Sequence, residues 1–224
     1  MLIEFIPQTD SEPIRNIYGL KSALLATIGP DTCVVFDIGG VFWDYDFTNV
    51  NKTIAKLAGC SVDLVNEVLG DNELFWSCCR GEITGQQYVR EVMRQLKLYM
   101  PTDTLLNVME NIWRKPSGLH RLVPEIATRA HSVCFLSNAT DFQHESSRRV
   151  FPEVFALVPR ERRFISHEIG VEKPNTEAFE HVKAKVPAAR YVLVDDKPEN
   201  GAGARACGYE FVWFSCRDPQ RTGQ

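Results

Sequence analysis

The sequence has no strong excess of charge of either sign and no long apolar run. Lys and Arg number 25 and Asp and Glu 29, which gives a formal net charge of −4 over 224 residues. Nucleic acids and anionic membranes attract clustered positive charge, so this balance argues against both as partners. No apolar stretch approaches the roughly 18 residues of a membrane span. The N-terminal stretch MLIEFIPQTDSEPIR lacks the basic start and hydrophobic core of a signal peptide, so none is expected.

The sequence also lacks the spacings that bind zinc or form redox motifs. It has seven cysteines, an odd number, and no two of them form a Cys-x-x-Cys pair. The five histidines form no His-x-x-x-His pair, so we expect no zinc site. Several cysteines stand in apolar segments, where a thiol behaves as a small hydrophobic group. We therefore expect free thiols and a cytoplasmic protein.

Short apolar runs that are rich in β-branched residues recur along the chain. Each has four or five residues with almost continuous hydrophobicity, which is typical of a parallel strand buried on both faces. The runs are Cys33–Phe36, Ser132–Leu136, Tyr191–Val194 and Phe211–Phe214. Helical patterns separate them, at Gly118–Ala130, Asp141–Val150, Thr176–Lys185 and Glu199–Cys207. This alternation predicts an α/β protein with a Rossmann-like open parallel sheet.

The region between the first two expected strands has a different pattern. It contains four amphipathic helical stretches and no convincing strand: Asn51–Ala58, Val62–Leu69, Gln86–Leu98 and Thr104–Trp113. We expect an inserted helical subdomain at residues 47–115 and an α/β core at 31–46 and 116–224. Residues 1–30 form an N-terminal extension in which Tyr18–Ile28 fits a short helix. The role of this extension and the oligomeric state are not readable from the sequence.

The residues that follow the expected strands are polar and acidic. In open α/β sheets, ligands bind beyond the carboxyl ends of the strands. Asp37-Ile38-Gly39-Gly40-Val41 follows the first run, Ser137-Asn138-Ala139-Thr140 the second, and Asp195-Asp196 the third. Carboxylates are ligands for a hard cation, and glycines let the backbone approach a ligand closely. The pattern predicts a metal and phosphate site at this edge of the sheet.

These three strand ends, together with Gly170-Val171-Glu172-Lys173-Pro174, resemble the four motifs of the haloacid dehalogenase (HAD) superfamily. The resemblance covers roughly residues 32–216, with the motifs in the family's order. The first motif is closest to a subgroup that reads FDxGxV and then DxDF, here Phe36–Val41 and Asp44–Phe47. That subgroup includes bacterial sugar-1-phosphate phosphatases. The stretch Arg80-Gly81-Glu82-Ile83-Thr84 also resembles their helical cap.

The resemblance implies a nucleophile and a metal site. Asp37 would attack phosphorus and form an aspartyl-phosphate that water then hydrolyses. Mg²⁺ would be bound by Asp37, by Asp196 and by the backbone carbonyl of Gly39, with Asp195 acting through a water. Two adjacent carboxylates repel each other without a cation, which favours this interpretation of the Asp195-Asp196 pair over a helix cap.

The resemblance also implies a set of residues around the transferred phosphoryl group. Ser137 and Asn138 would donate hydrogen bonds to it, Gly40 would lie beside it, and Lys173 would neutralise both the phosphate and the nucleophile. Asn200 would support the Asp195-Asp196 turn without touching the substrate. Outside the motif context, Ser137 and Asn138 would be an ordinary turn, Lys173 a solvated loop residue and Asn200 a local cap.

The sequence departs from the superfamily's usual phosphatase pattern two residues after the nucleophile. That position usually holds a second aspartate, the general acid for the leaving oxygen, whereas this chain has Gly39. Such an acid typically contributes about 10²–10⁴-fold to the rate. Asp44 and Asp46 are the nearest replacements, and the cap offers Glu73, Arg80 and Glu82. The alternatives are a leaving group that needs no acid, or a chain that has lost turnover.

The sequence therefore predicts an enzyme, a HAD-like phosphoric monoester hydrolase that depends on Mg²⁺. Its partner would be a small phosphorylated metabolite, with a sugar phosphate as the expected substrate. One alternative is a metal-independent haloacid dehalogenase. Another is a catalytically weak protein of the same fold that binds a phosphorylated ligand or a partner protein.

Overall fold

The computed structural model describes residues 12–218, which contain a five-stranded sheet and a separate two-stranded ribbon. The larger sheet is parallel throughout, in the order β5-β4-β1-β6-β7. Its strands are β1 (Thr32–Phe36), β4 (Ser132–Ser137), β5 (Arg163–Ile165), β6 (Arg190–Asp195) and β7 (Glu210–Trp213). The expected open parallel α/β sheet is confirmed. The hydrophobic runs did not predict β5, because this three-residue edge strand begins with an arginine.

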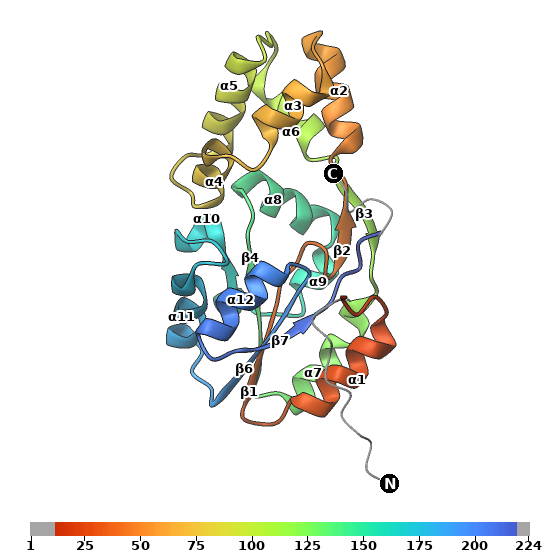
Figure 1. The fold of residues 1–224 in the computed structure, drawn as a ribbon, viewed down its shortest axis with the longest axis vertical. Helices are drawn as coiled ribbons and strands as arrows, with labels where there is room; N and C mark the ends of the chain where they lie inside the picture. Colours follow the sequence, from red (N-terminus) through yellow and green to blue (C-terminus); the bar gives the residue numbers. More distant parts are fainter. Residues whose placement is uncertain (1–11, 219–224) are drawn as a thin grey trace.

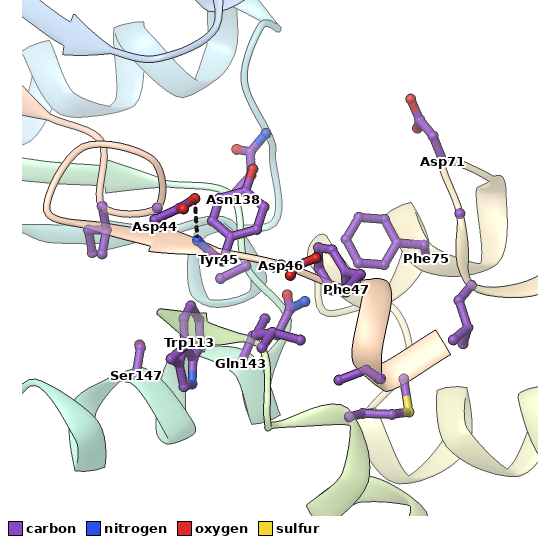
Figure 2. A pocket seen from close by; sticks show the side chains of 18 of the residues that line it. Asp44, Tyr45, Asp46, Phe47, Asp71, Phe75, Trp113, Asn138, Gln143 and Ser147 are labelled. Carbon is purple, nitrogen blue, oxygen red and sulfur yellow. Dashed lines mark hydrogen bonds between the residues drawn. The ribbon is translucent and has the colours of Figure 1, made fainter. Parts of the chain in front are cut away.

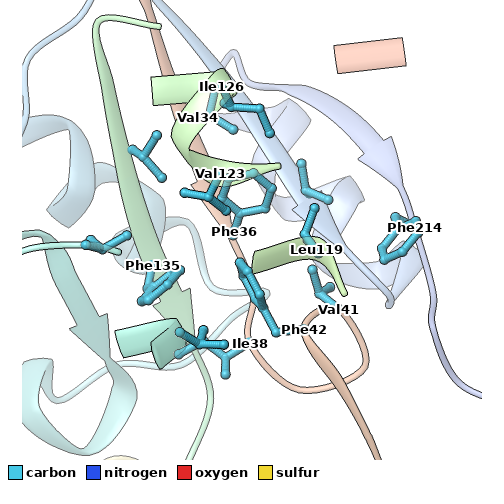
Figure 3. Packing of buried hydrophobic residues seen from close by; sticks show 14 of the residues in the cluster. Val34, Phe36, Ile38, Val41, Phe42, Leu119, Val123, Ile126, Phe135 and Phe214 are labelled. Atoms are coloured by element: carbon cyan, nitrogen blue, oxygen red, sulfur yellow. The ribbon is translucent and has the colours of Figure 1, made fainter. Parts of the chain in front are cut away.

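The sheet is buried on both faces, because alternate residues of its strands enter two separate hydrophobic clusters. Val34 and Phe36 of β1 pack in a cluster with helices α1 and α7, whereas Cys33 and Val35 pack with α11 and α12. Figure 1 shows the four helices on either side of the sheet, and Figure 3 shows the first cluster. Their bounds are α1 (Ile17–Thr27), α7 (Val123–Arg129), α11 (Thr176–Lys185) and α12 (Pro198–Ala206). Burial on both sides accounts for the almost continuous hydrophobicity of the strands.

Five helices lie together above the sheet in Figure 1, and we call them the helical insertion. They are α2 (Thr48–Ala58), α3 (Val62–Leu69), α4 (Glu73–Cys79), α5 (Gly85–Gln95) and α6 (Thr102–Met109). They bury a hydrophobic cluster of their own, to which Ile54, Val65, Val89 and Leu105 each contribute a fully buried side chain. Ser61 and Thr84 cap α3 and α5 by accepting backbone N–H groups. The sequence pattern did not predict α4.

A two-stranded antiparallel ribbon connects the helical insertion to the core. It pairs β2 (Trp43–Tyr45) with β3 (Trp113–Pro116). The expectation of a helix over Thr104–Trp113 and of no strand within residues 47–115 is therefore wrong at its end. Trp113 leaves the helical pattern because its ring packs edge-on against Trp43 at 5.8 Å and its Nε1 donates to Ser146 Oγ at 2.7 Å. Helix propensity is a weak preference that such tertiary contacts override.

The remaining elements are short, apart from one helix that follows β4. They are the 3₁₀ turns η1 (Leu119–Arg121) and η2 (Arg160–Arg162), and the helices α8 (Asp141–Val150), α9 (Pro152–Phe155) and α10 (Ser166–Ile169). The helical pattern at Gly118–Ala130 is thus divided between η1 and α7. Within residues 12–218, no helix is both long enough and apolar enough to cross a bilayer.

The N-terminal segment packs on the core along the edge strand β7. Its first eleven residues lie outside the part of the chain that the structure describes. The helix expected at Tyr18–Ile28 is confirmed as α1, and its Leu20 and Leu24 are fully buried in the first cluster. The N–H of Ile14 donates to the Trp213 carbonyl at 2.9 Å, and the Ile14 carbonyl accepts from the N–H of Ser215 at 3.0 Å. The segment therefore covers one face of the sheet and continues its edge.

The strand register brings the predicted site residues to one place. β1 is the central strand, and its last residue, Phe36, pairs with Phe135 of β4 and with Val194 of β6. Asp37 directly follows β1, and Ser137 and Asp195 are the last residues of β4 and β6, so all three lie at the same edge of the sheet.

Candidate active site

Asp37 stands at the centre of the site, directly after β1. Its backbone N–H donates to the Val194 carbonyl at 2.9 Å, which fixes the chain where the carboxylate emerges. The residue is 7% exposed, and Oδ1 lies 3.1 Å from Lys173 Nζ. That ion pair lacks hydrogen-bond geometry, so Oδ1 is buried without a hydrogen bond. An oxygen of this kind is free to attack or to bind a cation.

Lys173 is an almost completely buried cation between two carboxylates. Its residue exposure is 1%, and its Nζ lies 2.6 Å from Asp195 Oδ2. Burial alone would lower the pKa of Lys173, but the charges of Asp195 and Asp37 outweigh it and raise the pKa. The backbone of Lys173 is held by Asn138, whose Nδ2 donates to its carbonyl at 2.7 Å and whose Oδ1 accepts its N–H at 2.9 Å. The ammonium is therefore charged and tightly positioned.

Asp195 organises the turn after β6. Its side chain is fully buried, and Asn200 Nδ2 donates to both of its oxygens, at 3.0 and 3.1 Å. The N–H of Lys197 donates to Oδ1 at 2.9 Å, and Lys173 donates to Oδ2. Four donor contacts leave Asp195 little capacity to bind a ligand directly. Asn200 is thus bonded to this turn.

Asp196 differs from Asp195 because one of its oxygens has no donor among residues 12–218. Oδ1 is buried without a hydrogen bond, and the residue is 9% exposed. Burial, followed by the charges of Asp195 and Asp37, raises the pKa of Asp196 to about 8. A cation at this carboxylate would reverse that shift, because it favours the ionised form.

Gly40 makes room for Asp196 and does not face the cavity. Its φ of +74° is a backbone conformation that favours glycine, and a Cβ atom there would lie 2.3 Å from Asp196 Oδ2. Its N–H donates to the Trp43 carbonyl at 2.8 Å. The amide that a phosphate-binding role would use is thus already bonded within the first motif.

Three carboxylates at this edge fit a hard divalent cation. Asp37, Asp195 and Asp196 each place an oxygen within 4.8 Å of the others. Two of these residues, Asp37 and Asp196, have the buried oxygens without hydrogen bonds described above. All the donor atoms are carboxylate oxygens, which Mg²⁺ prefers over nitrogen or sulfur ligands.

A cavity of about 850 Å³ extends from Asp37 into the helical insertion. Its inner end is lined by Asp37, Gly39, Ser137, Asn138 and Lys173. Its outer part is largely apolar and aromatic, with side chains that include Phe75, Tyr88, Met109, Ile112 and Phe142. Figure 2 shows Asp44, Tyr45 and Asn138 grouped at one end and Asp71 and Phe75 at the other.

The carboxylates that the sequence offered as replacement acids are distributed between two places. Asp44 and Asp46 line the cavity, but each accepts a backbone N–H at 2.8 Å, from Tyr45 and from Thr48 respectively. Asp46 also lies 3.7 Å from Arg114 Nε. Arg80 and Glu82 stand outside the described cavity lining, in a surface cluster where Arg80 binds Glu73, Glu82 and, at 3.4 Å, Glu172. This cluster links the helical insertion to the loop that carries Lys173.

The structure adds two residues that sequence reasoning missed, Tyr45 and Arg217. The Tyr45 ring lies against Gly39, and the Arg217 guanidinium covers that ring with its Cζ 4.6 Å from the ring centroid. Burial and the Asp196 carboxylate raise the pKa of Tyr45, which keeps its phenol protonated. Tyr45 stands inside the Asp44–Phe47 motif, so its position was a signal. Nothing in the sequence marked Arg217, which reaches the site only because β7 ends there.

Comparison with known proteins supports the fold. No protein-family model matches the sequence. A HAD-family enzyme from Bacteroides thetaiotaomicron, solved with magnesium and inorganic phosphate, has a TM-score of 0.73 at 17% identity, over 86% of this chain and 99% of that one. A predicted HAD-like family hydrolase from Porphyromonas gingivalis has a TM-score of 0.71 at 18% identity, over 84% and 93%.

The same fold also occurs in an enzyme with different chemistry. A 2-haloacid dehalogenase from Pseudomonas syringae has a TM-score of 0.51 at 16% identity, over 84% of this chain and 86% of that one. The chain therefore has the fold of HAD-family enzymes, with their α/β core and helical insertion. At these identities the likeness shows the fold alone, and the chemistry must be argued from the site.

Proposed function

We propose that this protein is a Mg²⁺-dependent phosphatase that hydrolyses a small phosphorylated metabolite through an aspartyl-phosphate on Asp37. One observation carries the proposal: among the described residues, Asp37 and Asp196 each keep a buried carboxylate oxygen without a hydrogen bond, and buried Lys173 lies 3.1 Å from that of Asp37. Asp37 Oδ1 has the Lys173 ammonium beside it, but a buried oxygen such as Asp196 Oδ1 is costly to leave unpaired in a folded protein unless a cation or a substrate uses it. The magnesium and phosphate in the Bacteroides thetaiotaomicron enzyme support the same interpretation.

The metal would be held by Asp37, Asp196 and the backbone carbonyl of Gly39, with Asp195 acting through a water. When bound there, Mg²⁺ neutralises negative charge on the nucleophile and on the phosphoryl group, so that the two can approach. Asp195 fits this indirect role, because its own oxygens are already engaged by Lys173, Lys197 and Asn200.

Each residue of the site has its own role in the reaction. An Asp37 carboxylate oxygen attacks phosphorus, the bond from phosphorus to the leaving oxygen breaks, and water later releases inorganic phosphate and restores the carboxylate. Lys173 contributes a fixed positive charge 3.1 Å from Asp37 Oδ1. Ser137 lines the cavity and offers a hydroxyl to the phosphoryl oxygens. Asn138 holds the Lys173 loop through two hydrogen bonds, so its side chain acts by positioning that cation.

Metal dependence distinguishes this proposal from a haloacid dehalogenase. Attack on carbon in a haloacid needs no metal and gains nothing from a second and third carboxylate beside the nucleophile. The three clustered carboxylates of this chain favour phosphoryl transfer. They also argue against a protein that only binds a phosphorylated ligand, because an acidic cluster repels an anion unless a cation is present.

We propose that the helical insertion is the cap that selects the substrate. Its side chains, together with Phe142 of α8, line the outer cavity, where aromatic and aliphatic groups predominate. A sugar phosphate, the substrate expected from the sequence, would place its C–H face on such rings. An aryl phosphate would fill the same space with an apolar ring.

The test is a measurement of phosphate release from sugar, aryl and alkyl phosphates, with chelated protein and with added Mg²⁺. Asp37→Asn protein is the blank. We expect release only from the wild type and only with Mg²⁺. Chloride release from 2-chloropropionate in the presence of EDTA, without phosphate release from any ester, would replace the proposal with the dehalogenase.

A further inference from the structure

We propose, on the basis of the phosphatase function above, that the Tyr45 hydroxyl donates a hydrogen bond to the leaving-group oxygen. Position 39, two residues after the nucleophile, has no side chain to do so in this chain. Tyr45 lines the cavity together with Asp37 and Gly39. The phenol acts as a neutral donor that stabilises charge on the departing oxygen; that oxygen then takes its proton from water, and Tyr45 keeps its own.

The Tyr45 ring occupies the space into which a side chain at position 39 would extend. A Cβ atom built on Gly39 would lie 3.2 Å from Tyr45 Cε1 and 3.5 Å from Cδ1. Gly39 has no positive φ, in contrast to Gly40, so its backbone does not require glycine. The neighbouring ring is therefore what crowds a larger residue, which would push the ring by a few tenths of an ångström. The ring and an acidic side chain at position 39 are alternatives for the same place beside the nucleophile.

The nearby carboxylates are less suited to this task. One oxygen of Asp44 accepts the Tyr45 N–H, and one oxygen of Asp46 accepts the Thr48 N–H, so each carboxylate is used in local backbone structure. Among the described residues, no acceptor bonds the Tyr45 hydroxyl, although the ring itself is well packed. The hydroxyl thus remains available to a ligand.

The Tyr45 ring is held in place by Arg217, which follows the edge strand β7. Arg217 lies over it at 4.6 Å, and Arg217 Nη1 is 4.0 Å from Asp196 Oδ2. The N-terminal segment in turn holds this loop, because Arg15 Nη1 donates to the Arg217 carbonyl at 3.1 Å. A cation over an aromatic face is attracted to it, and partial burial strengthens that attraction. Tyr45 is thereby oriented before substrate binds.

The test compares leaving groups, because a donor at the leaving oxygen matters most when that oxygen is basic. Aryl oxygens carry negative charge well, whereas primary alkyl oxygens need help. In Tyr45→Phe we expect kcat for an alkyl phosphate to fall about 10- to 100-fold and kcat for an aryl phosphate to change less than about threefold. KM should change little for either ester. Tyr99→Phe, at a tyrosine that is 95% exposed, is the matched control and should match the wild type.

A second pair of variants tests the shared space. Gly39→Asp alone should lose activity, since its side chain meets the ring. Gly39→Asp combined with Tyr45→Ala should exceed Tyr45→Ala alone by about tenfold or more on the alkyl ester, because an acid then fills the vacated place. If Gly39→Asp raises activity on the alkyl ester as much in the presence of Tyr45 as in the Tyr45→Ala background, the two side chains do not compete and the proposal is wrong.

The remaining outcomes separate this proposal from the proposed function. Wild-type turnover that requires Asp37, with Tyr45→Phe equal to wild type on both esters, overturns the role of Tyr45 and leaves the phosphatase intact. A loss confined to alkyl esters in Asp44→Asn but absent from Tyr45→Phe assigns the donor to Asp44. If the wild type hydrolyses none of these esters in an Asp37-dependent way, both proposals fail.

Discussion

Lys173 is the residue on which the site's charge balance depends. It lies between Asp37 and Asp195, at 3.1 and 2.6 Å, with a side chain that is 1% exposed. Breaking a buried ion pair by removing one partner typically costs about 3–5 kcal/mol, because the other charge stays buried without compensation. We expect Lys173→Met to lose stability in that range, measured by urea unfolding of chelated protein. Lys183→Met removes the partner of an exposed Glu180 and should change the free energy of unfolding by less than about 1 kcal/mol.

A smaller loss in Lys173→Met than in Lys183→Met would mean that the buried lysine is not paired in solution. The comparison is matched, because both variants remove one ammonium group and keep a side chain of similar length.

The Asp37→Asn substitution tests the nucleophile without altering shape. The amide cannot attack phosphorus, so we expect kcat to fall by at least about three orders of magnitude. Stability should change little, because Lys173 keeps its contact with Asp195 at 2.6 Å and the substitution removes one of three mutually repelling carboxylates. Steady-state kinetics on freshly purified protein and a thermal melt check both parts. Turnover close to that of the wild type would exclude Asp37 as the nucleophile.

At the scale of secondary-structure elements, we expect the contact between α8 and α10 to make the free energy of unfolding depend on pH. His144 Nδ1 and His167 Nε2 lie 3.1 Å apart, and His144 is 9% exposed. Burial lowers the pKa of His144 to about 4, with further contributions from His167 and from Arg148, Arg163 and Arg160. Burial also lowers the pKa of His167, against the opposing charges of Glu168 and Asp141. The contact between the two helices thus includes a pair of histidines that are neutral at pH 7.

The direction of the resulting pH dependence follows from proton binding. Unfolded His144 binds a proton near its ordinary pKa of about 6.5, whereas the folded residue resists protonation down to about 4. Its contribution to stability is therefore present at pH 7 and is lost as the pH falls through that window. Between pH 7 and pH 5 we expect this residue to account for on the order of 2 kcal/mol of lost stability.

His144→Gln should remove that part of the acid sensitivity, measured by urea unfolding at pH 7 and pH 5. His131→Gln, at an exposed histidine, should leave the difference between the two pH values unchanged. An equal acid sensitivity in wild type and His144→Gln would show that the pair is not buried in solution.

For the whole molecule, the main expectation is that metal binding couples activity to stability. We expect EDTA to abolish phosphate release and Mg²⁺ to restore it. Ca²⁺ should inhibit, because its larger and more variable coordination shell misplaces the nucleophile. A ligand that binds only the folded state stabilises it, by about 2.7 kcal/mol at a hundred times its Kd. Mg²⁺ should therefore raise the Tm of the wild type.

Asp196→Asn should lose most of this rise in Tm, because it removes a carboxylate with an oxygen that no protein group engages. Glu153→Gln, at an exposed position, should keep it. A magnesium-induced shift of equal size in all three proteins would locate the binding elsewhere. Full activity after exhaustive chelation would contradict a metal-dependent mechanism.

Much of the fold was predictable because it rests on local pattern. The strands β1, β4 and β6 are buried on both faces and so leave nearly continuous apolar runs, and the edge strand β7 packs Val212 and Phe211 against the two clusters. The strands β2, β3 and β5 have only three or four residues, and partners distant in the chain decide their conformation. Trp113 belongs to β3 because its ring packs against Trp43 and its indole N–H donates a hydrogen bond to Ser146.

Some features of the candidate site likewise follow from the order of the strands, and others depend on tertiary packing. Asp37, Ser137 and Asp195-Asp196 could be named in advance, because parallel strands deliver their carboxyl ends to one edge. Three features of the site depend on how separate segments pack. They are the hydrogen bond that the Gly40 amide donates, the surface position of Arg80 and Glu82, and the approach of Tyr45 to Gly39. The N-terminal segment likewise acquires its place only when Ile14 meets β7 and Arg15 meets the Arg217 loop. Periodicity and strand order are properties of neighbouring residues, whereas the acid–base surroundings of Asp37 arise from side chains far apart in the chain, which meet only after the core has closed.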